Sequence, residues 1–367
     1  MSRRGLLSLV ITVAFSELVL AQRASVESLT RPAIPADPLE PVMGEAQAVQ
    51  TPEQRQAATS LLENARALSN VRAHPYDLKT TFTSFGSSSS DGAWSLEDIS
   101  PSRNVYRWTA QGPGYSAVNL YNSRLLYSNL PSGAIPLRLT QVREAIFFIY
   151  PNMGPYMSLR MAPGNLNGAS LQCVLAAQAF GGKSFSGSRN WEESEYCVDP
   201  QLGLLVSYSP TPGLYVHYDY TNAIRFHDKV IPSGFTIAEE GRPVIQAKTE
   251  SVTDPTGLNP GLFAPSGLSS IGVGSVMTPP SRVRSVLGGV PVSGNASLDV
   301  VVLLGVSSPD GHLTEAEILA SSNASLNQKA LDRAKNWQAG NQIQTQSGTT
   351  PQSHEVIFTF EFVTPST

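Results

Sequence analysis

Two cysteines are the residues best suited to covalent chemistry in this sequence. Cys173 and Cys197 stand on either side of a turn-rich stretch, residues 181–188, with the sequence Gly-Gly-Lys-Ser-Phe-Ser-Gly-Ser. A hairpin that turns there sets the two thiols opposite each other on neighbouring strands, and in an oxidising compartment they would pair. Such a bridge stabilises the folded state by roughly 3 kcal/mol. A metal site is the alternative, but the pair lacks CxxC spacing and has no histidine close by.

The remaining candidates for catalysis or metal binding form no motif. The histidines make neither HxH nor HExxH, and the sequence contains no GxSxG. The Gly-Val-Gly run at 272–274 lacks the strand–turn–helix context and the further glycine of a nucleotide-binding loop. We therefore predict a protein that is not an enzyme and that holds no metal or cofactor. The five scattered histidines are His74, His217, His227, His312 and His354.

The first 21 residues predict an export signal. Arg3 and Arg4 supply the positive start, residues 5–15 form an apolar run, and Val-Leu-Ala at 19–21 offers a cleavage site. We therefore expect an exported, periplasmic protein. The alternative is an inner-membrane anchor through residues 5–20, although a spanning helix needs about 20 apolar residues and Glu17 interrupts this run.

Composition favours a β-rich chain with two domains. The chain has 367 residues, and domains usually have roughly 100–200. Hydrophobic residues make up 41%, which is enough for buried cores, and 29 Gly with 27 Pro indicate many turns. The formal net charge of -4 gives no electrostatic case for nucleic-acid binding.

Residues 51–251 predict a curved antiparallel sheet with a helix in its concavity. A linker without periodicity, 22–50, comes first. Thr51 and Pro52 suit the start of a helix, and apolar residues recur at helical spacing to about Ser69. Short strands bounded by turn residues follow, interrupted by a second helical stretch near 138–150. A segment rich in Pro, Gly and Ser, 252–280, then predicts a second linker.

A strand–turn–strand pattern in this middle domain carries a family resemblance. Residues 195–205 read Glu-Tyr-Cys-Val-Asp-Pro-Gln-Leu-Gly-Leu-Leu, and 230–235 read Val-Ile-Pro-Ser-Gly-Phe. Together they resemble the half-barrel lipoprotein carriers of the LolA and LolB type over residues 50–250. The resemblance implies a cavity that holds a lipid or acyl chain. A generic open β-sheet protein is the alternative.

The C-terminal residues 281–367 predict a small β-β-α-β module. The apolar strand 298–306 is followed by the turn 308–311 and an alternating strand, 312–319. Ser325 and Gln328 form a capping box before a helix that buries apolar residues up to Trp337. The last strand, 355–362, places four apolar side chains on one face and the polar ones on the other. The fold class predicted for the whole chain is thus α+β.

This module resembles the C-terminal domain of TonB-family proteins. The resemblance is carried by the apolar first strand, the turn 309–311, the serines at 321–322, the helix up to Trp337 and the closing strand. It implies binding of a partner protein, such as an outer-membrane receptor segment, by strand addition in TonB-dependent transport. The edge expected to bind consists of Glu355, Val356, Ile357, Phe358, Thr359, Phe360, Glu361 and Phe362. A periplasmic lipid or lipoprotein carrier that uses the middle half-barrel stays open as the alternative function.

Overall fold

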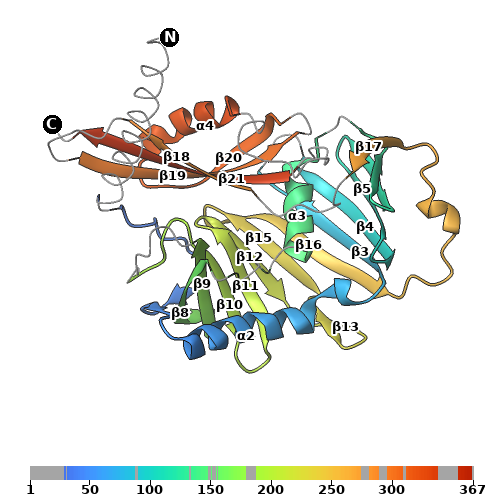
Figure 1. Cartoon of the computed structure of the whole chain (residues 1–367), viewed down its shortest axis with the longest axis horizontal. Coiled ribbons are helices and arrows are strands. Elements are labelled where there is room, and N and C mark those ends of the chain that lie inside the picture. Colours follow the sequence, from blue (N-terminus) through green and yellow to red (C-terminus); the bar gives the residue numbers. More distant parts are fainter. Residues whose placement is uncertain are drawn as a thin grey trace, which may run out of the picture.

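The computed structural model has an α+β fold dominated by antiparallel strands, as the sequence predicts (Figure 1). No helix in the described residues is long and apolar enough to cross a membrane. The expected export signal, 1–21, lies outside them. The structure describes residues 29, 31–86, 90–131, 134–147, 150, 154, 156–178, 187–273, 281–288, 296–308, 311–337 and 354–365.

One long, curved antiparallel sheet forms the body of the protein. Its strand order places β16 beside β3, so the strands before and after α3 form one surface. Several β-bulges interrupt the pairings, and each adds local bend and twist. In spatial order the strands are β1 (Val42–Met43), β8 (Met157–Leu166), β9 (Ala169–Gln178), β10 (Ser194–Asp199), β11 (Leu204–Thr211), β12 (Leu214–Asp219), β15 (Gly234–Glu239), β16 (Arg242–Thr253), β3 (Tyr76–Ser84), β4 (Gly92–Ser102), β5 (Val105–Gly112), β6 (Tyr115–Asn122), β7 (Leu125–Ser128) and β17 (Ser269–Val273).

The helix α2 (Pro52–Ser69) covers part of the concave face (Figure 1). Its predicted start is confirmed, because the side chain of Thr51 accepts a hydrogen bond from Gln54 N and the Gln54 side chain accepts one from Thr51 N. The small and apolar side chains on one face pack against β8, β10 and β11 and against the hairpin strand β14 (Lys229–Ile231), which pairs with β13 (Ile224–Phe226). The buried members are Ala58, Leu62 and Ala65.

A second helix, α3 (Leu137–Phe147), lies between the large sheet and the C-terminal sheet (Figure 1). Arg138 near its start is buried and binds Glu239 of β15 at 2.6 Å and Glu317 of the C-terminal sheet at 2.9 Å. One guanidinium thus bridges the two sheets, which also share an apolar core. At the turn between β11 and β12, Gly213 (φ +81°) lies so close to the C-terminal sheet that a Cβ would meet Leu319 O at 1.8 Å.

The C-terminal sheet has four strands rather than the three predicted. β18 (Ser281–Leu287) pairs in parallel with β21 (His354–Pro365), which pairs on its other side with β19 (Ala296–Ser307), and β20 (Leu313–Ser321) forms the far edge. The helix α4 (Asn327–Lys335) begins after a 3-10 turn, η3 (Ala324–Leu326), which Asn323 caps. The predicted capping by Ser325 is therefore wrong, because Asn323 already provides the oxygen for that backbone.

Both faces of this sheet are buried. Phe358, Phe360 and Phe362 pack on one face against Ala330 and Ala334 of α4, as the sequence predicts. The opposite face, which carries the polar residues of β21, is buried as well: Ile357 and alternate apolar residues of β19 join the core of the large sheet. The polar residues of β21 on this side, Glu355, Thr359 and Glu361, are buried with it.

The two segments predicted as linkers are bound to the sheets in their described parts. Residues 31–50 cross the large sheet, where β1 and β2 (Gln47–Ala48) pair with the edge strand β8. Arg31 binds Glu192 and, at 3.0 Å, Glu361 of β21. In the second segment, β17 extends the large sheet by pairing with β7. Edge strands offer unpaired backbone groups, so even sequence without periodicity can become a strand beside them.

Candidate functional site

The strand predicted as a free, peptide-binding edge is an interior strand. Residues 355–362 lie in β21, whose backbone pairs with β18 on one side from Ser281↔Val356 to Leu287↔Phe362. On the other side β19 pairs with it along its whole length. The expectation fails because residues 281–287, which the sequence analysis left unassigned within the module, supply a parallel neighbour. Strand addition at this position would first have to displace β18.

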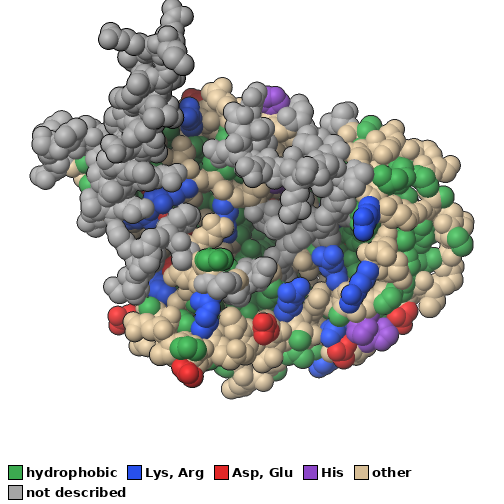
Figure 2. Space-filling model, viewed as in Figure 1, with side chains coloured by type: hydrophobic (Ala, Val, Ile, Leu, Met, Phe, Trp, Pro, Cys, Tyr) green, Lys and Arg blue, Asp and Glu red, His purple; other side chains and the backbone are tan. Residues whose placement is uncertain are grey.

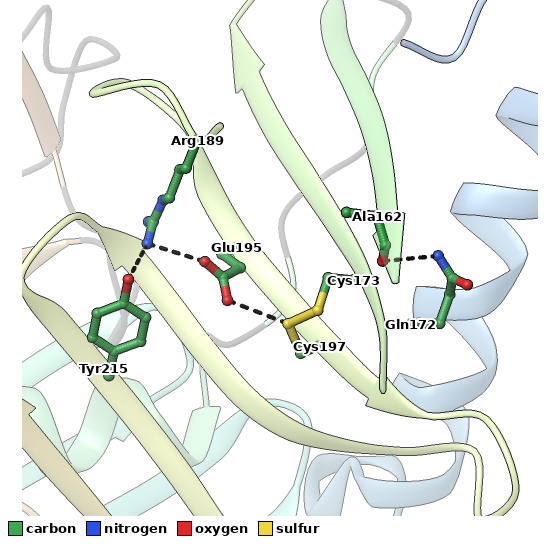
Figure 3. The surroundings of a disulfide bond; sticks show 7 residues. All are labelled: Ala162, Gln172, Cys173, Arg189, Glu195, Cys197 and Tyr215. Carbon is green, nitrogen blue, oxygen red and sulfur yellow. Dashed lines mark hydrogen bonds and ion pairs between the residues drawn. A yellow bond between two sulfur atoms is a disulfide. The ribbon is translucent and has the colours of Figure 1, made fainter. Parts of the chain in front are cut away.

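The predicted disulfide between Cys173 and Cys197 is present in the structure (Figure 3). The two residues are register partners on β9 and β10, so the expected neighbouring strands are confirmed, although the turn at 181–186 lies outside the described residues. Cys197 Sγ lies 3.2 Å from Glu195 Oε1, and Glu195 Oε2 lies 3.3 Å from Arg189 Nη1. Burial raises the pKa of Glu195 to about 7, against the opposing effect of Arg189.

This cluster offers little for binding or catalysis. Cys173, Glu195 and Cys197 are the acidic and sulfur side chains that come close enough to share a metal ion within the described residues. With both sulfur atoms in the disulfide, one carboxylate is left as a ligand. Cys197 also belongs to a separate convex-side cluster, whereas its neighbours Tyr196 and Val198 face the main core. The disulfide therefore braces the sheet from the side opposite to α2.

A cavity of about 660 Å³ opens on the concave side of the large sheet. It lies where α2 ends and passes into the 3-10 turn η1 (Val71–Ala73), beside the turn between β4 and β5 and the end of α3. The lining is divided between basic, aromatic and small polar side chains. Its members are Arg66, Ser69, Asn70, Arg72, Ala73, His74, Pro75, Ser100, Ser102, Arg103, Tyr106, Tyr121, Ile146, Phe147 and Tyr150.

Beneath one wall of this cavity lies a buried polar cluster. The Tyr106 hydroxyl donates to Asp98, and Arg143 Nη2 donates to that hydroxyl at 3.1 Å. The Arg143 guanidinium also lies 4.4 Å from the centre of the Trp108 ring. Burial raises the pKa of Asp98 to about 7, while Arg143 acts in the opposite direction. These groups bind one another, so they fix the orientation of Tyr106 in the wall.

A second cavity of about 30 Å³ adjoins the first and shares Ser69, Ile146 and Tyr150 with it. The Tyr150 hydroxyl lies 3.1 Å from Ser69 Oγ, and burial raises its pKa to about 12. The side chains around this cavity come from the core between α2, α3 and the sheet, and most are apolar. They include Val71, Leu78, Leu205, Ile231, Pro232 and Phe235.

The rim of the larger cavity is basic. Arg66, Arg72 and Arg103 are exposed there, and the lining contains no Asp or Glu. Figure 2 shows Lys and Arg side chains gathered on this face between the end of α2 and the strands β3–β5. Sequence reasoning missed this site because its residues come from segments more than 80 positions apart. The one local signal was the Asn-Val-Arg-Ala-His run at 70–74, just after the predicted helix end.

Comparisons with known proteins give structural resemblances alone. No protein-family model matches the sequence, and no curated protein matches it. A LolA superfamily protein from Nitrosomonas europaea is 12% identical and aligns over 56% of this chain and 97% of its own, with a TM-score of 0.38. A domain of a putative outer membrane lipoprotein-sorting protein from Vibrio parahaemolyticus is 10% identical over 56% and 97%, with a TM-score of 0.33.

Both structures are of the kind that the middle region was predicted to resemble, and neither is described as a TonB-family protein. Both TM-scores lie below 0.5. The site that remains is the cavity itself. Its combination of aromatic and small polar side chains with exposed arginines is a property of this chain.

Proposed function

We propose that this protein is a non-enzymatic carrier of the cell envelope that holds a lipid or acyl chain in its middle domain. The observation that carries this proposal is the concave-side cavity, whose volume of about 660 Å³ falls in the range of about 300–1,000 Å³ typical of small-molecule sites. The sheet is covered by two helices, yet their ends leave this volume unfilled. A protein whose helices served only as packing would fill it with side chains.

The position of the smaller cavity supports an extended apolar ligand. It continues from the larger cavity past Ser69, Ile146 and Tyr150 into the core. An acyl chain that follows this path would bury its methylene groups at about 0.8 kcal/mol each. Movement of a side chain such as that of Ile146, which is partly buried, would widen the passage.

The alternative of strand addition by the C-terminal module has no comparable support. Its expected edge is occupied by β18, and its other flank by β19. In the proposed carrier the C-terminal sheet is a structural unit that closes one side of the core. An enzymatic role is not proposed either, because Asp98, Tyr106 and Arg143 bind one another, and of the three Tyr106 alone lines the cavity.

Mass spectrometry of the purified full-length protein tests the proposal. We expect acyl-containing molecules to co-purify, and a fluorescent fatty acid to bind after they are removed. Replacing Ile146 by Trp narrows the passage and should reduce both co-purified lipid and fatty-acid binding at least tenfold. Leu125→Trp, at an exposed position on β7, is the matched control and should bind as the unmodified protein does.

A protein that carries no lipid and binds no fatty acid would overturn the carrier. Equal binding by the Ile146→Trp and Leu125→Trp variants would place any lipid elsewhere. Binding of extended peptides that is lost when β21 is altered would favour the strand-addition alternative. Circular dichroism of each variant establishes that it is folded before binding is compared.

A further inference from the structure

We propose that the rim of the cavity recognises an anionic headgroup, a phosphate or a carboxylate, through Arg66, Arg72 and Arg103. The inference rests on the proposed carrier function and specifies its ligand as an anionic amphiphile. The headgroup would lie at the basic rim while the apolar part enters between α2 and α3. Neutral and zwitterionic lipids would bind less well.

The three guanidiniums come from three different elements. Arg66 lies in the last turn of α2, Arg72 in η1, and Arg103 in the turn between β4 and β5. All three line one cavity and all are exposed. Arg66 has a second role available, since a cation at a helix C-terminus stabilises the helix dipole. Arg72 and Arg103 do not lie at the C-terminus of an α-helix, so substitutions of these two residues test headgroup binding more clearly.

The three rim arginines lack the carboxylate partner that several other arginines of this protein have. Arg138, Arg160 and Arg189 are buried and each binds a glutamate. Within the described residues, none of the three rim guanidiniums forms an ion pair or a hydrogen bond through its side chain. The fold thus places three like charges around one opening, and the buried Asp98 beneath it interacts electrostatically with Arg72. An anion bound at the opening would relieve the repulsion between the like charges.

Two acidic groups near the rim are already bound. Asp98 accepts a hydrogen bond from Tyr106 and interacts electrostatically with Arg72 and Arg143. Asp228 lies 2.7 Å from His74 Nε2 and 2.6 Å from Lys229 Nζ, and these two hydrogen bonds lower its pKa to about 2. Its charge is balanced by these partners. The carboxylate of Asp228 is therefore directed to His74 and Lys229 rather than to the rim arginines.

Guanidinium groups suit this ligand chemistry. Their planar arrangement of N–H donors matches a phosphate or carboxylate in a bidentate manner, and charge-assisted hydrogen bonds of this kind are the stronger ones. The aromatic wall formed by Tyr106, Tyr121 and Phe147 borders the rim and would pack against the first methylene groups of the tail. The site thus places a polar end next to an apolar end, as an amphiphile requires.

The test compares two fluorescent probes with the same tail, cis-parinaric acid and its methyl ester, on the full-length protein. We expect the acid to bind more tightly than the ester, and more weakly as salt is added. Arg72→Gln and Arg103→Gln should each weaken binding of the acid about tenfold, as loss of a charge-assisted hydrogen bond does, and leave the ester unaffected. Arg107→Gln removes the same charge from the residue next to Tyr106, outside the lining, and should change neither probe.

Each outcome separates this inference from the carrier proposal. If acid and ester bind alike and the rim variants match Arg107→Gln, the headgroup inference is overturned while the carrier stands. If neither probe binds, the carrier fails, and the inference fails with it. If inorganic phosphate displaces the acid at concentrations comparable to that of the probe, the site takes a free anion, and the amphiphile is overturned as its ligand.

Discussion

The two sheets of this protein are each covered by helices, but one arrangement is filled and the other is hollow. In the C-terminal sheet the phenylalanines of β21 fill the space beneath α4, where Ala330 and Ala334 let the helix approach closely. On the concave face of the large sheet, α2 and α3 pack tightly along their buried sides, yet a cavity remains where they end. The same type of layer packing therefore gives a solid core in one place and a cavity in the other.

The difference lies in what the helix ends bring to the sheet. α4 presents small residues over large aromatic ones, so the two surfaces interdigitate at the density of a protein interior. α2 ends in Ser69 and Asn70 and turns away through η1, and it places polar and basic side chains where apolar ones would be needed to fill the space. A hollow region is thus built by polar termini, and its residues should contribute little to stability.

Truncation of a residue in the filled core beneath α4 should have the largest effect on stability. Phe358 is fully buried, with its ring centre 5.3 Å from that of Trp337 and 5.7 Å from that of Phe360. Phe358→Ala should lower the free energy of unfolding by about 3–5 kcal/mol, through lost burial and the void that is left. Urea denaturation followed by circular dichroism measures this loss. A loss below about 1 kcal/mol, equal to that of Val286→Ala at an exposed site of β18, would mean that this region is not tightly packed.

The buried polar face of β21 should make stability depend on pH. Burial raises the pKa of Glu355 to about 8 from an ordinary value near 4.5, so the folded state holds a proton that the unfolded state releases. Its contribution is complete below pH 4.5 and is lost as the pH rises to 8, at up to about 1.4 kcal/mol per pH unit. Glu317, with a pKa of about 8, acts in the same direction.

Replacing Glu355 by Gln isolates this effect. The amide cannot ionise, so the variant should equal the unmodified protein at pH 5 and exceed it in stability at pH 8. Urea midpoints at the two pH values give the difference, and Glu63→Gln, at an exposed position of α2, is the control. Parallel pH dependence in all three proteins would show that the Glu355 carboxyl reaches water, and that this face of the C-terminal sheet is open.

Features that depend on residues close together in the chain, or on one pair of neighbouring strands, could be predicted from the sequence. The start of α2 followed from Thr51 and Pro52, and the row of alternate phenylalanines in β21 placed them together beneath α4. The pairing of Cys173 with Cys197 followed from the turn-rich stretch midway between them. Each of these depends on neighbours within a strand pair or one helical turn.

Features that depend on distant segments were missed. The alternation of charge and apolar side chains in β18 did not suggest a parallel partner for β21, because no local pattern selects a strand more than 60 residues away. Glu355 and Glu361 alternate with apolar residues as on an exposed face, yet the large sheet covers them. The rim of the cavity could not be predicted either, because α2, η1 and the β4–β5 turn meet only in the folded protein.

Loss of the disulfide should have an intermediate effect that leaves the hollow region unchanged. Cys173→Ala/Cys197→Ala should lower the free energy of unfolding by roughly 3 kcal/mol, since the bridge closes a loop with a sequence separation of 24. The bond lies on the convex side, so fatty-acid affinity should stay the same while the variant is folded. Urea denaturation with and without reductant measures the loss, and reductant should not affect the variant. A simultaneous loss of binding would mean that the shape of the cavity depends on the covalent bridge between β9 and β10.

The smallest effect on stability is expected at the rim. Arg72→Gln removes an exposed charge that binds no partner among the described residues, so the free energy of unfolding should change by no more than about 0.5 kcal/mol. Relief of repulsion from the neighbouring arginines and loss of the attraction to the buried Asp98 oppose each other, so the net change should be small and should diminish at high salt. Urea midpoints at low and high salt measure both. A loss of 2 kcal/mol or more would show that Arg72 is part of the packed structure. The cavity rim would then support the fold as the filled C-terminal sheet does, and the contrast between the two regions would not hold there.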